Sequence, residues 1–193
     1  MDHEQVRLAV AGLLDALELD MLPEERELTS KRVADLWAEL LSGVGEEPAA
    51  LLRGGFSGGH QDLVALREIP FFSMCEHHLL PFFGKVSIAY LPGPSGQIAG
   101  ASNLARVVSL VSRRLQIQER LTSEIAEAVM EGVSAAGALV VAEGEHLCMT
   151  MKDHTDVGSK LLTTSAVGAL RDDPDLRREA MSLLRRAEQE FMG

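Results

Sequence analysis

A dense group of polar side chains, Ser73-Met-Cys-Glu-His-His78, lies between two apolar segments of the chain. A second polar group, Glu145-His-Leu-Cys148, follows another apolar segment. Cysteine and histidine are the usual zinc ligands in proteins, and three such ligands with one open position are typical of a catalytic zinc site. Cys75, His78 and Cys148 can supply that set, so the chemistry first indicated is activation of water by a metal.

Spacing alone leaves a second interpretation open. A buried cysteine is more often a small apolar residue of the core than a ligand. A single Cys-x-x-His pair is also a weak zinc motif, because structural zinc sites combine two such pairs. If the metal site is present, His77 and His146 are left for proton transfer, since imidazole changes its charge near neutral pH.

The first third of the chain is predicted to be helical, because apolar residues recur there at helical spacing. The first stripe consists of Val6, Val10, Leu13, Leu14 and Leu17, and the second of Val33, Leu36, Trp37, Leu40 and Leu41. Thr29 or Ser30 is the expected N-cap of the second helix, which should end at Ser42-Gly43. The glycine-rich segment 53–60 predicts a mobile loop.

Strands and helices are predicted to alternate in the rest of the chain. Alternating apolar residues indicate strands at Leu63–Ile69 and Lys85–Leu91. Further strands are expected at 97–99, 138–143, 147–152 and around 161–169. One helix is expected to carry Leu104, Val107, Val108, Val111 and Leu115, a second Ile125, Val129 and Val133, and a last helix should begin at Asp173-Pro174. Strands that turns can join favour an antiparallel sheet with helices on one face, which is an α+β fold.

Composition excludes several classes of protein. The 193 residues suffice for one ordinary domain, and 46% hydrophobic and 24% charged residues are typical of globular proteins. The net charge of −11 argues against nucleic acid or an anionic membrane as the main partner, because both attract basic surfaces. No apolar run reaches the roughly 20 residues of a membrane span. The acidic N-terminus lacks a secretion signal, so a cytoplasmic location is expected, where two cysteines favour a metal or catalytic role.

Three segments resemble the GTP cyclohydrolase I family almost residue for residue. They are CEHHLLPFFGKVSIAYLP at 75–92, RRLQIQERLTSEIAEAV at 113–129 and EGEHLCMTM at 143–151. The resemblance extends from Leu28 to Arg178 with all segments in the family's order. It implies a tunnelling fold assembled as a toroidal homodecamer, with 1–52 as an N-terminal helical region and 53–193 as the catalytic domain.

The resemblance also implies roles for individual residues. The zinc ligands would be Cys75, His78 and Cys148, the catalytic residues His77 and His146, and the substrate-binding residues Gln118, Glu119, Ser102, Arg106, Arg32, Lys152 and Lys160. In this family Zn2+ activates water for attack at C8 of the guanine, while a histidine protonates the purine. A carboxylate holds the guanine edge. The expected reaction converts GTP to 7,8-dihydroneopterin triphosphate with release of formate.

The chain departs from the family where the triphosphate should bind. Lysines expected three positions after Arg32 and directly after Ser102 are Asp35 and Asn103 here. The segment after Cys148 also gains carboxylates and a histidine, at Asp153, His154 and Asp156. Each charge-assisted contact to phosphate contributes roughly 1.5–3 kcal/mol. Either other cations compensate, or the substrate is a less phosphorylated guanine nucleotide, nucleoside or base.

Other classes agree less well with these residues. A zinc-binding regulator without activity would not need both His77 and Glu119. The tunnelling-fold reductases that act on deazaguanine nitriles have a different cysteine context, without Cys-Glu-His-His. A purely structural protein would not place polar groups at the ends of three strands.

Overall fold

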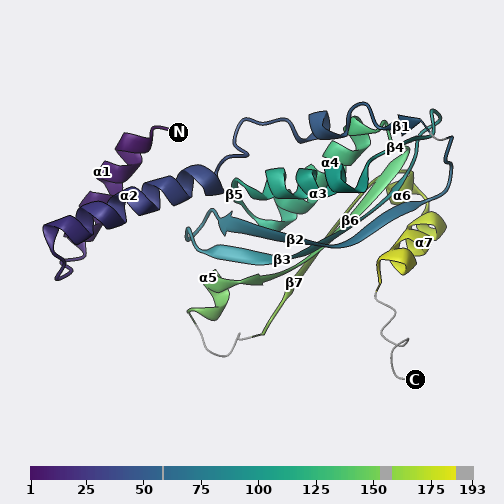
Figure 1. Cartoon of the computed structure of the whole chain (residues 1–193). Coiled ribbons are helices and arrows are strands. Elements are labelled where there is room, and N and C mark those ends of the chain that lie inside the picture. Colours follow the sequence, from purple (N-terminus) through teal and green to yellow (C-terminus); the bar gives the residue numbers. More distant parts are fainter. Residues whose placement is uncertain (58, 153–157, 186–193) are drawn as a thin grey trace, which may run out of the picture.

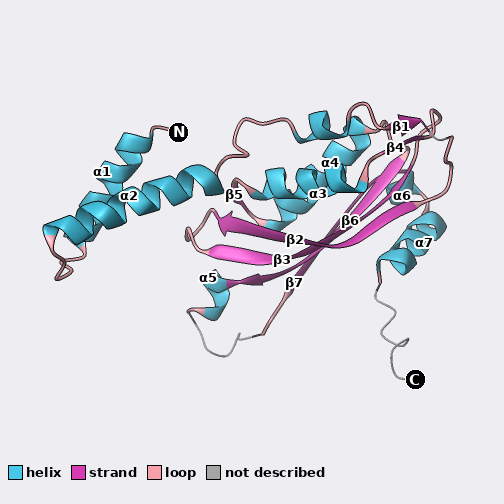
Figure 2. Cartoon of the chain, in the orientation of Figure 1, coloured by secondary structure: helices cyan, strands magenta, loops and turns pink. Residues whose placement is uncertain are grey.

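The computed structural model describes residues 1–57, 59–152 and 158–185. In this part of the chain, a hairpin of two helices projects from a layered body (Figure 1). The body combines a twisted sheet with helices that pack on it (Figure 2). The predicted mixture of helices and an antiparallel sheet is therefore confirmed.

Five strands form the main sheet of the described residues. In spatial order they are β5 (Leu115–Gln116), β2 (Val64–Cys75), β3 (Pro81–Leu91), β6 (Gly137–His146) and β7 (Leu161–Gly168). All neighbours are antiparallel except β5, which runs parallel to β2. The β2–β3 pairing continues as far as Met74 and Pro81, so these strands are longer than predicted. The polar group around Cys75 therefore lies at the end of a hairpin.

The main core lies between this sheet and the helices α3 (Ala101–Ser112) and α4 (Gln118–Gly132). Alternation along β3 sends Val86, Ile88 and Tyr90 to this side, where all three are fully buried. Burying one large aliphatic side chain contributes roughly 1.5–3 kcal/mol. The packing of α3 and α4 against the strands thus holds the sheet whose strand ends carry the polar groups around Cys75 and His146.

A smaller core lies on the opposite face of the sheet. Leu170 of α6 (Ala169–Asp172) and Ala180 of α7 (Pro174–Leu184) pack there with residues of β3 and β6. Helices thus occupy both faces, and the expectation of helices on one face holds only for α3 and α4. The predicted start of the last helix is confirmed, because the Asp173 side chain accepts hydrogen bonds from two backbone N–H groups of the first turn.

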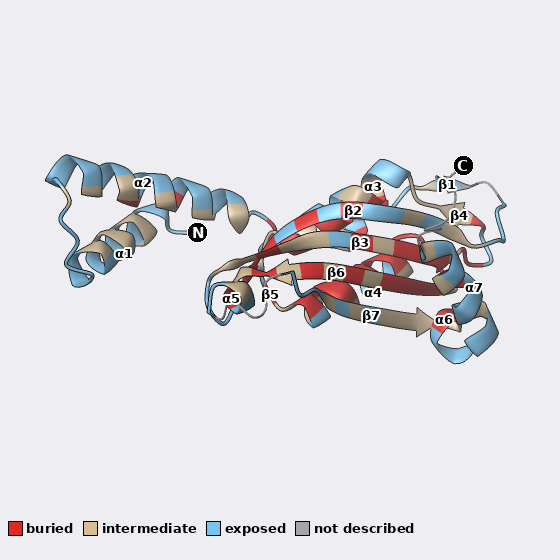
Figure 3. Cartoon of the chain, turned by 90° about the horizontal axis from the view of Figure 1, so that it is seen from below, coloured by how far each residue is buried: buried red, intermediate tan, exposed pale blue. Residues whose placement is uncertain are grey.

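The N-terminal hairpin consists of α1 (His3–Ala16) and α2 (Pro23–Leu40), which pack on each other. The predicted start of α2 at Thr29 or Ser30 is wrong. Pro23 begins the helix, and the Ser30 hydroxyl donates to the carbonyl of Arg26 inside it. Much of the hairpin is exposed, leucines included (Figure 3). No helix in the described residues is long and apolar enough to cross a membrane.

Three further expectations need correction. Residues Phe56–Ser57, within the predicted mobile loop, form a strand β1 that pairs with β4 (Gln97–Ile98). Leu115 belongs to β5, because α3 already ends at Ser112. The predicted strand at 147–152 is instead the short helix α5 (Leu147–Thr150). A segment this short is compatible with the period of a strand and with one turn of helix, so periodicity alone could not separate them.

Candidate metal centre and active site

The hairpin turn between β2 and β3 positions the first polar group. The backbone N–H of Cys75 donates to the carbonyl of Leu80 (2.9 Å), and that of Leu79 donates to the carbonyl of Cys75 (2.9 Å). Leu79 has a φ of +54°, a left-handed conformation that costs roughly 1–2 kcal/mol for a residue with a side chain. The N–H of Glu76 also donates to the carbonyl of Gln116 in β5 (3.1 Å). These bonds hold the turn in a strained but defined shape.

Cys75, His78 and Cys148 come together at this turn. One possible ligand atom from each lies within 4.8 Å of those from the other two. Cys148 reaches the group because α5 follows β6, which pairs with β3. Both cysteines are buried free thiols, whereas His78 is exposed. Two sulfur donors and one imidazole are soft ligands that suit zinc, and three ligands leave a fourth position open.

The surroundings of Cys148 favour the protonated thiol when no metal is bound. Burial raises the pKa of the Cys148 thiol, and the neighbouring Cys75 raises it further. A divalent cation would offset this cost, because metal binding deprotonates a coordinating thiol. Lys152 Nζ lies 2.6 Å from Nε2 of His78. This contact anchors one nitrogen of the exposed imidazole ring.

His77 lies beside the group and is exposed to solvent. Its Nδ1 is 4.0 Å from the sulfur of Cys75. The neighbouring Glu76 forms an ion pair with Arg120, and this hydrogen-bonded guanidinium lowers the pKa of the Glu76 carboxyl. Arg120 also donates to the carbonyl of Leu115 and to the side chain of Gln116. The turn that carries His77 is thereby tied to the start of α4.

His146 ends β6 and is buried on the face of the sheet that α3 and α4 cover. Its ring stacks on Phe82 with the ring centroids 4.6 Å apart and the planes 9° from parallel. Burial lowers the pKa of His146, although the nearby charge of Glu119 acts in the opposite direction. The neutral form is therefore favoured, in which one ring nitrogen can accept a proton.

Gln118 holds His146 from the first residue of α4. Its Oε1 lies 2.9 Å from Nε2 of His146, and its side chain has no exposed surface. Its Nε2 donates to the carbonyls of Ala142 and Leu161 and to the hydroxyl of Thr163. The next residue, Glu119, is exposed at the same end of the helix.

The proposed phosphate-binding residues are spread over the chain. Arg32 is exposed on α2, and Ser102 and Arg106 are exposed on α3. We call Cys75, His78 and Cys148 the metal group. Within the described ranges, no hydrogen bond or ion pair joins the side chains of Arg32, Ser102 or Arg106 to it. Asp35, one turn after Arg32, pairs with His3 of α1 at 2.7 Å.

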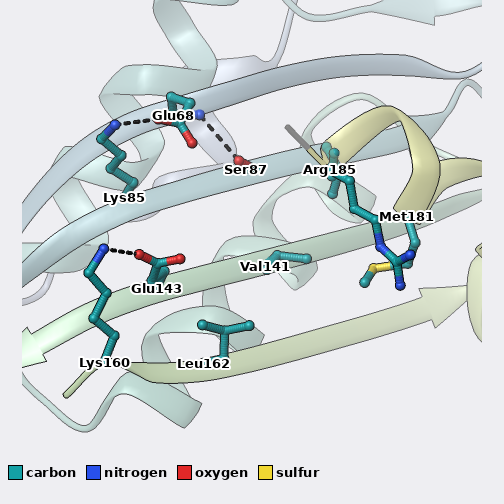
Figure 4. A pocket seen from close by; sticks show the side chains of 10 residues that line it. Glu68, Lys85, Ser87, Val141, Glu143, Lys160, Leu162, Met181 and Arg185 are labelled. Carbon is teal, nitrogen blue, oxygen red and sulfur yellow. Dashed lines mark hydrogen bonds and ion pairs between the residues drawn. The ribbon is translucent and has the colours of Figure 1, made fainter. Parts of the chain in front are cut away.

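Lys160 lies on the opposite side of the sheet from His146. It pairs with Glu143 in a cavity of about 520 Å³, which also holds the pair of Lys85 and Glu68 (Figure 4). The fold therefore places Lys160, a predicted phosphate ligand, on the face of the sheet opposite to His146. Asp153, His154 and Asp156 lie outside the described residues.

Several residues of this site were not singled out from the sequence. Phe82 stacks on His146, Arg120 holds the Cys75 turn, and Thr122 and Thr163 contact Gln118. Phe82 lies in an ordinary strand pattern and carried no signal. The two threonines were the detectable signal, because each places a hydroxyl at a position that faces the apolar core.

Comparisons with known proteins show which family this chain belongs to. The family model described as GTP cyclohydrolase I matches residues 6–185. The GTP cyclohydrolase 1 of Dehalococcoides mccartyi (strain CBDB1) is 42% identical over 95% of this chain and 97% of its own length. That of Streptococcus thermophilus (strain CNRZ 1066) is 44% identical over 95% and 98%. A crystal structure of the archaeosine synthase QueF-Like in the apo form has a TM-score of 0.46 and 19% identity, covering 57% of this chain and 97% of that chain.

The family match covers nearly the whole chain. It includes most of α1, all of α2, the metal group and the helices α3 and α4. The two relatives are similar over almost their entire lengths, so the similarity is not confined to one motif. The chain belongs to the GTP cyclohydrolase I family.

Proposed function

We propose that this protein hydrolyses GTP at C8 of the guanine ring, releases formate and forms 7,8-dihydroneopterin triphosphate. The observation that carries the proposal is the meeting of Cys75, His78 and Cys148 within 4.8 Å. Nδ1 of His77 lies 4.0 Å from the Cys75 sulfur, and His146 directly precedes the short helix that carries Cys148. The family to which the chain belongs supports the choice of substrate. Pterin and folate biosynthesis is the corresponding area of metabolism.

Cys75, His78 and Cys148 would hold a zinc ion. When bound, the ion supplies a water molecule whose pKa is lowered towards neutrality. The protein contributes the shape of the site: the strained turn fixes Cys75 and His78, and α5 brings Cys148 to them. Lys152 limits the rotation of the His78 ring through its contact with Nε2.

Two histidines divide the proton transfers in this proposal. Attack at C8 of a purine needs N7 to be protonated first, and exposed His77 can act as that acid. His146 is buried and its pKa is lowered, so it is available as a proton acceptor. The bond from C8 to N9 then breaks, and a second hydrolysis releases formate before the ribose rearranges and the ring closes again.

Glu119 is the proposed anchor of the guanine edge. A carboxylate offers acceptors to the N–H groups of the guanine ring, a pattern that adenine does not present. Glu119 is exposed in the first turn of α4, directly after the residue that holds His146. Glu119, which would recognise the base, thus directly follows Gln118, which contacts His146.

The phosphate end of the site would involve more than one copy of the chain. Arg32, Ser102 and Arg106 make no direct contact with the metal group within the described part of one chain. A ring of subunits, the toroidal homodecamer of the tunnelling fold, would bring such residues from neighbouring copies to each metal. The exposed leucines of the hairpin favour such an assembly, because large apolar surfaces are usually covered by a partner.

One observation favours a second candidate substrate. Asp35 places a carboxylate one turn after Arg32, and Asn103 is neutral. A less phosphorylated guanine nucleotide, nucleoside or base would be repelled less than GTP by such a site. C8 hydrolysis itself would be unchanged.

The test of the proposed function is formate release by the zinc-loaded protein. GTP, GDP, GMP, guanosine and guanine are supplied separately at equal concentrations well below saturation. We expect GTP to be used best, with a pterin triphosphate as the product. A clear preference for GMP, guanosine or guanine would establish the second candidate, and no formate from any of them would refute both.

A further inference from the structure

The buried side chain of Gln118 connects His146 to the body of the protein. We propose that Gln118 is a positioning residue that holds His146 in one tautomer, with the proton on Nε2 and the lone pair on Nδ1. This inference deepens the proposed function and rests on it for the use of His146 in the reaction. It assigns Nδ1 as the nitrogen that takes part in chemistry.

The orientation of the Gln118 amide follows from its acceptors. The atom at one end of the amide lies 3.1 Å from the carbonyl oxygen of Ala142 and 2.9 Å from that of Leu161. Backbone carbonyl oxygens only accept hydrogen bonds, so this end must be the NH2 group. The other end, which faces His146, is therefore the oxygen.

The tautomer of His146 follows from that orientation. The amide oxygen of Gln118 carries no hydrogen and lies 2.9 Å from Nε2 of His146. A hydrogen bond between them requires Nε2 to be the donor. In the neutral ring the single proton is then on Nε2, and Nδ1 keeps its lone pair.

Two threonines complete the network behind Gln118. Thr163 Oγ1 is 3.2 Å from the amide nitrogen and 2.6 Å from Oγ1 of Thr122, which in turn donates to the backbone carbonyl of Gln118 at 2.6 Å. Thr163 can accept from the amide and donate to Thr122, so each hydroxyl hydrogen has an acceptor. No buried side-chain nitrogen or oxygen of the described residues lacks a partner.

The absence of a side chain at Gly144 leaves room for the amide oxygen of Gln118. A Cβ atom at Gly144 would lie 2.4 Å from Oε1 of Gln118, closer than real contacts allow. On the other side, Phe82 fixes the plane of the imidazole by stacking. Gly144 of β6 and the carbonyls that bind the amide therefore fix Gln118, and the stack on Phe82 fixes the ring of His146.

Burial separates this role from direct substrate binding. The Gln118 side chain has no exposed surface, and both ends of its amide are engaged by protein atoms. Loss of the side chain should therefore alter kcat through His146 and leave KM largely unchanged. A residue that touches the substrate would raise KM instead.

The direct test is nitrogen NMR of zinc-loaded protein in which only histidine is labelled with 15N. Solid-state spectra suit an assembly of any size. His146 is one of six histidines and is identified by subtracting the spectrum of His146→Phe. At a pH where the ring is neutral, we expect one population with protonated Nε2 and bare Nδ1. A proton on Nδ1, or a mixture of tautomers in the unmodified protein, would overturn the proposal.

Kinetics of Gln118→Met provide the second test. The variant should keep its zinc, show a mixture of tautomers at His146 and lose on the order of 10²-fold in kcat, with KM within about twofold. Gln116→Met is the matched control, because it also deletes a buried amide that donates to a backbone carbonyl but has no contact with imidazole. It should leave the His146 spectrum unchanged.

Unchanged kcat in Gln118→Met, or a raised KM with normal kcat, would contradict the positioning role. If Gln118→Met does not fold, the spectrum of the unmodified protein decides alone. The spectrum is recorded without substrate, so it is independent of the proposed function. Absence of formate release from GTP would refute that function while leaving the tautomer assignment intact.

Discussion

At Cys148, burial and the neighbouring Cys75 both favour the protonated thiol, whereas Lys152 favours the thiolate. A metal ion would reverse the balance, because coordination replaces the proton with a stronger positive charge. The same residue would then be an ordinary buried thiol without metal and a ligand with it. Residues of the site thus depend on each other for their charge.

We predict that Cys148→Ser loses both the metal and the activity. The unmodified protein should bind about one zinc ion per chain, since three ligands with soft donors form one site. Elemental analysis and formate release measure the two losses. Met149→Ser is the control: it changes an exposed neighbour on the same short helix and should retain zinc. Formate release by metal-free protein would contradict the metal assignment.

We predict that His77→Ala retains zinc but lowers kcat for formate release by roughly 10²–10⁴-fold. His77 is not one of the three grouped ligands, and its proposed role is to protonate the purine. His60→Ala provides the control, because His60 is an exposed histidine that belongs to no part of the site. Full activity of His77→Ala would transfer the acid role to another group.

At the scale of elements, the strand β3 links the core to both parts of the site. Its start carries Phe82, which stacks on His146, and its end carries Tyr90, which is fully buried. The Tyr90 hydroxyl accepts a hydrogen bond from the backbone N–H of Ala99, 2.9 Å away, at the connection to α3. Burial raises the pKa of Tyr90, more than the hydrogen bond lowers it.

Because the pKa of Tyr90 is raised, we predict that the free energy of unfolding falls at alkaline pH. Its folded pKa is raised above the unfolded value of about 10, so the unfolded chain releases the proton first. The stabilising contribution is complete below pH 10 and is lost as pH rises through the folded pKa. Tyr90 is the single tyrosine of the chain, so ultraviolet absorbance of tyrosinate reports it directly.

The midpoint of that titration should lie above 10 in the folded protein and return to about 10 in denaturant. The free energy of unfolding of the unmodified protein should also fall more steeply above pH 10 than that of Tyr90→Phe. A folded midpoint at or below 10 would contradict the effect of burial.

At the scale of the whole molecule, the residues proposed to bind phosphate lie on other elements than the three grouped ligands. The metal group and His146 lie at one end of the sheet, whereas Arg32 belongs to the projecting hairpin (Figure 1). The net charge of −11 also makes local cations important for any phosphorylated substrate. Binding of the triphosphate should therefore depend on assembly and on ionic strength.

We predict that Asp35→Lys combined with Asn103→Lys lowers KM for GTP by a few-fold. Exposed ion pairs contribute about 0.2–1 kcal/mol each, and salt screens them over about 8 Å at 0.15 M. The gain should thus be larger at low ionic strength. Asp20→Lys controls for the change in net charge, because Asp20 is exposed in the connection between α1 and α2. An unchanged KM at low salt would place these positions away from the phosphates.

The sequence by itself determined the elements with strong periodicity and the chemistry of the metal group. The alternation of Val86, Ile88 and Tyr90 predicted β3, and Asp173-Pro174 predicted the start of α7. Local rules suffice there, because side chains on one face of a strand or at a helix cap are set by near neighbours. The resemblance to GTP cyclohydrolase I then predicted which residues would be the zinc ligands, and the structure groups Cys75, His78 and Cys148.

The tertiary structure alone decided how distant residues meet. The stack of Phe82 on His146 and the reserved space at Gly144 arise from the pairing of β3 with β6 and the packing of α4. The short segment after His146 is a helix rather than the predicted strand, and its length is too small for periodicity to decide between the two. The orientation of the Gln118 amide depends on carbonyls from two strands, and no pattern along the chain records which acceptors a buried donor will find.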